Sequence, residues 1–89
     1  MVTIIVYGDI KRRIGTRKIE INVQGKTLRE LPISIAKRYN IEDLIFRENK
    51  IRSELLILVD GADWNSLGYL DKEVKEGSTI KLVPVWHGG

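Results

Sequence analysis

The sequence predicts an α+β fold of two layers, in which a mixed sheet of four to five strands packs on one main helix. Strand-like segments stand at both ends of the chain, and one long amphipathic segment lies between them. The length of 89 residues suits one domain with a core of its own. Because the chain is short, we expect the first and last long strands at the centre of the sheet.

The first two strand-like segments form a predicted antiparallel hairpin. Residues 2 to 7, VTIIVY, are rich in β-branched and aromatic residues and run into Gly8 and Asp9, a typical turn. Residues 17 to 23, RKIEINV, alternate apolar and polar side chains, which indicates a strand with one buried face. We expect residues 8 to 16 to be a short connection between them.

A helix is predicted over residues 27 to 40. Thr27 followed by Glu30 has the spacing of a capping box. Apolar residues then recur at spacings of three and four, as one helical stripe requires: Leu28, Leu31, Ile35 and Tyr39. Pro32 lacks the N–H of a helical residue, so we expect an irregular first turn or a helix that starts near Pro32.

The segment from 40 to 54 is rich in charged residues and has no clean period. We expect a long, partly ordered connection there. It carries three consecutive apolar residues that attach it to the core, Leu44, Ile45 and Phe46.

The remainder predicts more of the sheet. LLILVD at 55 to 60 is a strand, and GAD at 61 to 63 is a tight turn. Residues 64 to 78 suggest a short strand and a single helical turn. TIKLVPV at 79 to 85 is the last strand, with Pro84 near its end.

The composition narrows the class of protein. With 43% hydrophobic and 30% charged residues, the chain lies in the ordinary globular range. Its apolar runs are too short for a spanning helix, and its start has no basic leader region, so we expect a cytoplasmic protein away from membranes. The absence of cysteine excludes disulfides, Cys-based zinc sites and any thiol or persulfide on this chain.

No residue set for catalysis is visible in the sequence. His87 is the only histidine, and no serine, acid pair or glycine-rich loop has an activating motif around it. We therefore expect no catalytic residue, no metal site and no bound cofactor on this chain.

A basic cluster lies in and beside the first hairpin: Lys11, Arg12, Arg13, Arg17 and Lys18. It could steer an acidic protein or an RNA, or simply keep the turn soluble, and we favour the second reading. The cluster has no interleaved exposed aromatic residues, so we expect no direct contact with nucleic acid.

The outer face of the sheet is a predicted docking surface. Side chains alternate along a strand, so the neighbours of the residues that face the helix point outward. Four apolar residues then share the outer face: Ile5, Tyr7, Val83 and Val85. Exposed patches of this kind mark docking sites. The alternative is that residues 40 to 54 cover the patch.

The sequence ends VPVWHGG. Glycine has no Cβ, so Gly88 and Gly89 can lie extended in a narrow channel and bring a terminal carboxylate to the active site of another enzyme. A carboxylate is inert until it is activated, for example by adenylation. The alternative is a frayed end without function.

The element order of strand, strand, helix, strand, short strand and strand is the β-grasp arrangement. LLILVDGADWNSLGYLD at 55 to 71 and HGG at 87 to 89 resemble the ubiquitin-related modifier family of ubiquitin-like sulfur carriers. The resemblance implies a β-grasp domain over residues 1–85 and a flexible diglycine tail over 86–89. It also implies a monomer that has no turnover of its own.

The resemblance further implies a sequence of partners. An ATP-dependent activating enzyme would adenylate Gly89, and a rhodanese-type sulfurtransferase would convert it to a thiocarboxylate. A tRNA thiolase would then use the sulfur on a wobble uridine, or Gly89 would be joined to lysines of target proteins. The ATP is used by the activating enzyme.

Residue roles follow from the same resemblance. Gly89 is the carrier residue, and the tail contacts to the activating enzyme are Gly88, His87 and Trp86. The outer-face residues Ile5, Tyr7, Val83 and Val85 dock the partner. We expect Trp64, in the ADW turn, to be a structural plug.

Two other functions stay open. A carrier for molybdopterin or thiamine biosynthesis has the same tail. A third possibility, of a different class, is an RNA-binding or regulatory β-grasp module that does not use its carboxylate.

Overall fold

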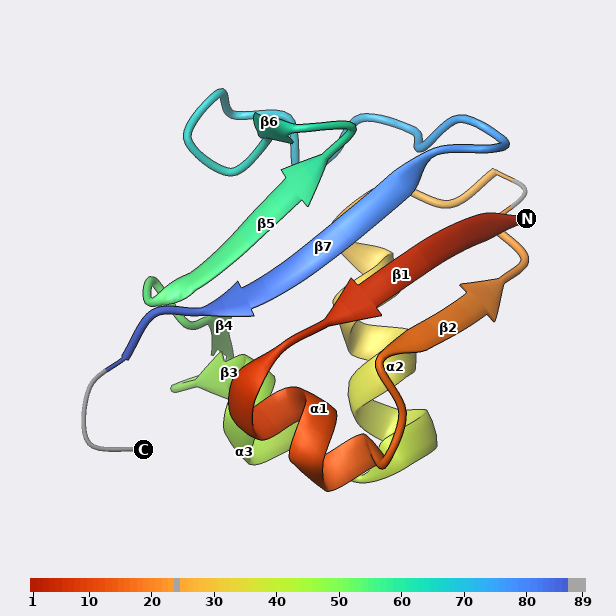
Figure 1. Ribbon diagram of the computed structural model, residues 1–89. Helices are drawn as coiled ribbons and strands as arrows, with labels where there is room; N and C mark the ends of the chain where they lie inside the picture. Colours follow the sequence, from red (N-terminus) through yellow and green to blue (C-terminus); the bar gives the residue numbers. More distant parts are fainter. Residues whose placement is uncertain (24, 87–89) are drawn as a thin grey trace.

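The computed structural model describes residues 1–23 and 25–86 and shows a mixed sheet with helices packed on one side of it (Figure 1). The sheet has five strands in the order β2-β1-β7-β5-β6. Their bounds are β1 Val2–Val6, β2 Lys18–Ile21, β5 Leu55–Val59, β6 Ala62–Asp63 and β7 Thr79–Pro84. The helices are α1 Gly8–Ile14, α2 Glu30–Tyr39 and α3 Glu42–Ile45, and a small separate hairpin joins β3 Phe46–Arg47 to β4 Lys50–Ile51.

The first and last long strands lie side by side in the middle of the sheet, as predicted. β1 pairs with β7 in parallel, with Ile4 opposite Ile80. β2 and β5 flank this pair, and both run antiparallel to their neighbours. The predicted hairpin of β1 and β2 is therefore confirmed.

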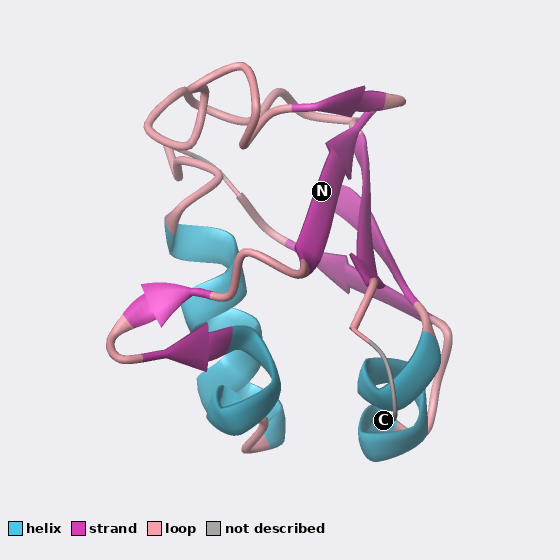
Figure 2. Cartoon of the chain, turned by 90° about the vertical axis from the view of Figure 1, so that its left-hand side faces the viewer, coloured by secondary structure: helices cyan, strands magenta, loops and turns pink. Residues whose placement is uncertain are grey.

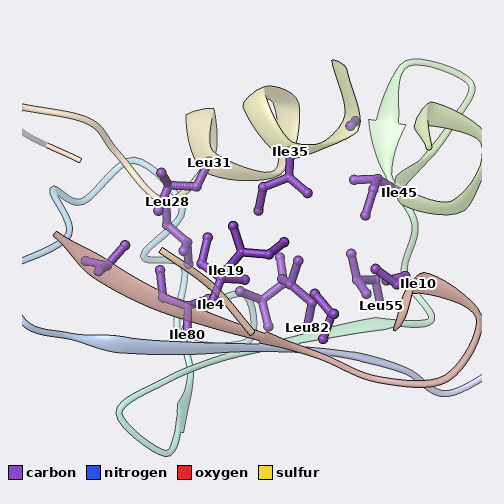
Figure 3. Close-up of a cluster of buried hydrophobic side chains, with 14 of the residues drawn as sticks. Ile4, Ile10, Ile19, Leu28, Leu31, Ile35, Ile45, Leu55, Ile80 and Leu82 are labelled. Carbon is purple, nitrogen blue, oxygen red and sulfur yellow. The ribbon is translucent and has the colours of Figure 1, made fainter. Parts of the chain in front are cut away.

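The core lies between the inner face of the sheet and α2 (Figure 3). Alternate residues of β1 and β5 are buried, and the residues between them are half-buried. Four fully buried side chains show how the layers meet: Ile4 and Leu82 from the sheet, and Leu31 and Ile35 from α2. Two residues of the predicted stripe, Leu31 and Ile35, lie on the face that α2 buries. Leu28 is buried just before the helix begins, and Tyr39 is only partly buried.

The prediction of a plain connection over residues 8 to 16 was wrong, because most of it forms α1. Ile10 and Ile14 lie one turn apart, so both face the core, and Ile10 is 0% exposed. Gly15 ends the helix with φ 88°, and its N–H donates to the Lys11 carbonyl at 2.9 Å. Only two apolar residues mark this helix, which is too few to show a period in the sequence.

The irregular helix start predicted from Pro32 is confirmed. α2 begins at Glu30, three residues after the expected cap. The Glu30 Oε1 atom accepts hydrogen bonds from the Thr27 N–H at 3.2 Å and the Thr27 hydroxyl at 3.1 Å. Thr27 thus braces the turn before the helix. Pro32 lies in the first turn, where its missing N–H removes no intrahelical bond.

Residues 40 to 54 contain more regular structure than the sequence indicates. Ile45 is buried, and Leu44 and Phe46 pack against the core, so the predicted attachment is confirmed. The unpredicted elements are α3 and the β3–β4 hairpin, which turns through two residues of positive φ, Glu48 and Asn49. These elements are too short for a hydrophobic period. They lie on the α2 side of the sheet, so they leave its outer face uncovered (Figure 2).

The turn after β5 comes earlier than predicted. Asp60 and Gly61 have φ values of 49° and 90°, and β6 follows at once, within the segment expected to be the turn. Residues 64 to 78 are turns with one bridge, between Thr27 and Glu73, in place of the expected strand and helical turn. Trp64 packs against the core, as expected of a plug.

Within residues 1–23 and 25–86, no helix is long and apolar enough to cross a membrane.

Candidate docking face and tail root

The outer face of the sheet is turned toward the viewer in Figure 1 and carries the half-buried residues of three strands. In one row across it, Ile5 of β1 lies opposite Lys81 of β7, which lies opposite Leu58 of β5. In the next row, Val83 lies opposite Leu56. The apolar part of this face, which we call the outer patch, comprises Ile5, Val83, Leu56 and Leu58.

Leu56 and Leu58 were missed by the sequence analysis. The signal was present, because LLILV is apolar at five consecutive positions and side chains alternate along a strand. Both faces of β5 are therefore apolar. The outer patch therefore extends beyond β7 onto β5, a strand that carries none of the four predicted docking residues.

Two predicted docking residues lie at the margin of the outer patch. Tyr7 is half-buried just before α1, and the Arg17 guanidinium lies 5.7 Å from its ring centre. Val85 follows β7 and is 52% exposed, while its N–H donates to the Glu54 carbonyl at 2.9 Å. The chain thus leaves the sheet through a residue whose backbone is still bonded to the domain.

Part of the basic cluster is occupied by internal partners. Arg12 pairs with Asp9. Arg13 donates to both carboxylate oxygens of Asp43, at 3.2 and 3.1 Å, and this contact holds the pKa of Asp43 below its usual value. These pairs favour the interpretation that the cluster solubilises the surface of α1 and the turn after it.

The tail root is Trp86, which is half-buried and packs against the core. Its indole Nε1–H donates to Asp9 Oδ2 at 3.1 Å. The guanidinium carbon of Arg52 lies 4.2 Å from the centre of the Trp86 ring. Asp9 and Arg52 were not predicted, because no sequence pattern links residues so far apart. The predicted site residues His87, Gly88 and Gly89 lie outside the described residues.

The described residues thus provide two features, the outer patch and the tail root, Trp86. A hollow of about 860 Å³ opens between Met1, Val23 and residues 72–76. Because Met1 lines this hollow, it lies beside the marked N-terminus, at the opposite end of the sheet from the end of β7 (Figure 1). Among the described residues, no group of three His, Asp or Glu is placed to hold a metal ion.

Comparison with known proteins gives consistent matches. The model of the ThiS family matches residues 4–89. The ubiquitin-related modifier 1 homolog of Drosophila willistoni is 32% identical over 89 residues, covering 96% of this chain and 84% of that protein.

Solved structures are similar over nearly the whole chain. Urm1 of Sulfolobus solfataricus is 27% identical with a TM-score of 0.69, and the match covers 93% of this chain and 99% of that one. A chain of the Amycolatopsis orientalis BexX/CysO complex is 25% identical with a TM-score of 0.80, and the match covers 100% of both. The predicted ubiquitin-like β-grasp fold is confirmed.

Proposed function

Because the chain belongs to the ThiS family and to the ubiquitin-related modifier family, we propose that it is a protein carrier loaded at Gly89 by other enzymes. An ATP-dependent activating enzyme joins the Gly89 carboxylate to AMP and releases pyrophosphate. The persulfide of a rhodanese-type sulfurtransferase then attacks the activated carbonyl, displaces AMP and forms an acyl disulfide. A second protein thiol reduces this acyl disulfide, which leaves the thiocarboxylate on Gly89 and a disulfide between the two thiols. The sulfur then serves 2-thiolation of a tRNA wobble uridine, and Gly89 can also be joined to lysines of target proteins. In this scheme Gly89 is the last residue of the working protein.

The observation that carries this proposal is the course of β7. This strand runs through the middle of the sheet, contributes Val83 to the outer patch, and leads directly to Trp86. A partner that binds the outer patch therefore has the root of the tail at the edge of its contact. Gly88 and His87 lie between that root and the reacting carboxylate in the sequence and contact the partner's channel.

The charge on the outer face indicates the chemistry of the partner surface. Lys81 lies inside the outer patch, and Lys18 lies opposite Ile5 at its margin. Neither lysine forms an ion pair with any described residue. An apolar surface with acidic groups complements this arrangement and would be guided to it at low salt.

The absence of cysteine supports the terminal carbon as the place where sulfur is carried. A chain without a thiol cannot hold sulfur as a persulfide of its own. In the proposed scheme the sulfur therefore comes from a persulfide on another protein, which attacks the activated carbonyl of Gly89 and displaces AMP.

The direct test is the intact mass of the protein purified from its own organism. We expect a fraction in which one terminal oxygen is replaced by sulfur, or conjugates that join Gly89 to lysine. The control is a chain that lacks Gly89, which should show neither product and should lose tRNA thiolation. Unchanged thiolation and conjugates in that variant would rule out the carrier role.

A second test addresses the outer patch. Val83→Asp places a carboxylate in the outer patch, whereas Leu67→Asp changes an apolar residue that is 54% exposed and lies outside the strands of the sheet. We expect Val83→Asp to raise the KM for this protein in adenylation about tenfold or more, as loss of an apolar contact at an interface does. Leu67→Asp should have little effect. Equal KM values for the two variants would refute docking through the outer patch.

The pathway is tested by identifying the proteins that bind the carrier. We expect a tRNA thiolase among proteins recovered with the wild-type chain and missing when Gly88 and Gly89 are deleted. Recovery of an enzyme of molybdopterin or thiamine synthesis in its place would keep the carrier chemistry and change the recipient.

A further inference from the structure

The side chain of Trp86 is held by two elements that belong to different parts of the fold. Asp9, in the first turn of α1, accepts its indole hydrogen bond, and Arg52, after β4, lies over its ring. The same Asp9 carboxylate is paired on its other oxygen with Arg12. The hydrogen-bond acceptor is therefore itself held in place, and only 23% of its side chain is exposed.

The Arg52 side chain is largely buried where it contacts Trp86. It is only 14% exposed, and its Nε atom is buried without a hydrogen-bond partner in the part of the chain that the structure describes. Its terminal nitrogen lies 3.6 Å from a Glu54 carboxylate oxygen, while its guanidinium carbon lies over the indole ring. A planar guanidinium stacks on an aromatic ring in a way that a lysine ammonium cannot reproduce.

The backbone on both sides of this corner is also fixed. A Cβ on Gly8 would come within 2.9 Å of Pro84 Cγ, so the start of α1 approaches the end of β7 closely. The Val85 N–H is bonded to the Glu54 carbonyl, two residues after Arg52. The two holding elements thus converge on the last residues before the tail.

We propose that Asp9 and Arg52 are positioning residues that clamp Trp86 to the domain, so that only His87, Gly88 and Gly89 lie between the clamp and the active site of the activating enzyme. This inference rests on the proposed carrier function. Three residues span at most about 11 Å when fully extended. The active site of the activating enzyme must therefore come to within that distance of the corner formed by α1 and Arg52, and its docking contact must include this corner as well as the outer patch.

The clamp also affects the affinity of the enzyme for the carrier. A side chain that is already ordered need not be ordered at binding, and that ordering costs roughly three- to tenfold in affinity for one large side chain. Loss of the clamp should therefore raise KM by roughly three- to tenfold and leave kcat unchanged, because the reacting carboxylate is chemically the same.

Steady-state kinetics with the adenylating enzyme of the source organism test whether KM rises while kcat stays unchanged. Asp9→Ala and Arg52→Lys should each show the raised KM. Asp9→Asn keeps an acceptor oxygen for the indole N–H and should restore a KM near that of the wild type. Two matched controls lie elsewhere: Asp71→Ala breaks an acid–arginine pair with Arg29, and Arg38→Lys changes an arginine whose guanidinium lies over the Tyr39 ring. Both should leave KM unchanged.

A measurement without any enzyme tests the clamp itself. In ¹⁵N relaxation and water-exchange spectra of the whole chain, the Trp86 indole N–H should be as rigid as the backbone of β7. In Asp9→Ala it should become mobile and exchange faster, while the Trp64 indole stays unchanged as the internal reference.

A mobile Trp86 indole in the wild type would overturn the inference, as would a KM that rises equally in the Asp71→Ala control. If the wild-type chain is not adenylated at all, the carrier function fails, and the indole measurement still decides whether the clamp exists.

Discussion

Replacing Gly8 with alanine should destabilise the protein far more than the same change at Gly15. Gly8 has a φ of +57°, a region that costs an ordinary residue roughly 1–2 kcal/mol. Its new Cβ would also lie 2.9 Å from Pro84 Cγ, a distance that forces the proline ring or the start of α1 to move. Overpacking of this kind costs typically 1–3 kcal/mol.

Gly15 provides the matched comparison. Its φ of +88° is also positive, but a Cβ there meets nothing within 4 Å. Both changes reduce the entropy of the unfolded chain by the same amount, so that contribution cancels. We expect Gly15→Ala to lower the free energy of unfolding by about 1–2 kcal/mol and Gly8→Ala by about 2–5 kcal/mol.

Urea unfolding followed by circular dichroism measures both values, and a double-mutant cycle isolates the contact. Pro84→Ala removes the Cγ atom that the new Cβ would meet. In that background, Gly8→Ala should cost at least about 1 kcal/mol less than it does in the wild type. Equal losses for Gly8→Ala and Gly15→Ala, or a cycle with no coupling, would refute the reasoning.

Three further predictions concern the core, the start of α2 and the response to acid. Ile10→Ala should lower the free energy of unfolding by about 2–5 kcal/mol, since Ile10 is fully buried, and half-buried Ile14→Ala should cost clearly less; urea midpoints compare them. Glu30→Ala removes the acceptor for both Thr27 donors and should cost about 0.5–1 kcal/mol in the same assay, with exposed Glu42→Ala as control. The Arg29 hydrogen bond holds the pKa of Asp71 below its ordinary value, so its contribution to stability is present above about pH 4 and is lost as the pH falls through the lowered folded value. Asp71→Asn should therefore make the loss of stability below about pH 4 less steep, and urea midpoints that fall identically in both proteins would contradict this.

The sheet and its main helix were predictable because each carries a long pattern. The alternation in RKIEINV placed Ile19 and Val23 in the core, and the spacing of Leu31 and Ile35 gave the buried face of α2. α1 and the β3–β4 hairpin were not predictable, because a helix with two apolar residues and strands of two residues leave no period to detect. Only packing against the finished core defines them.

The candidate site divides in the same way. The outward position of Ile5 and Val83 follows from alternation along a strand, and the same rule could have added Leu56 and Leu58. The contacts of Trp86 could not be predicted, because Asp9 and Arg52 reach it only after α1 and the segment after β4 have folded against the end of β7. Such a contact depends on tertiary structure and leaves no local trace.

The central position of β7 has a consequence for how the molecule is made. Ile4 pairs with Ile80, so the middle of the sheet closes only when the last strand has left the ribosome. Pairing across such a long sequence separation is slower than the formation of local structure. A shortened chain would lack β7, the strand with which both β1 and β5 pair. Residues 86 to 89 follow β7 in the sequence and are therefore synthesised last. An incomplete or unfolded chain thus does not present the outer patch together with these residues. An enzyme that requires both would thereby load only finished molecules.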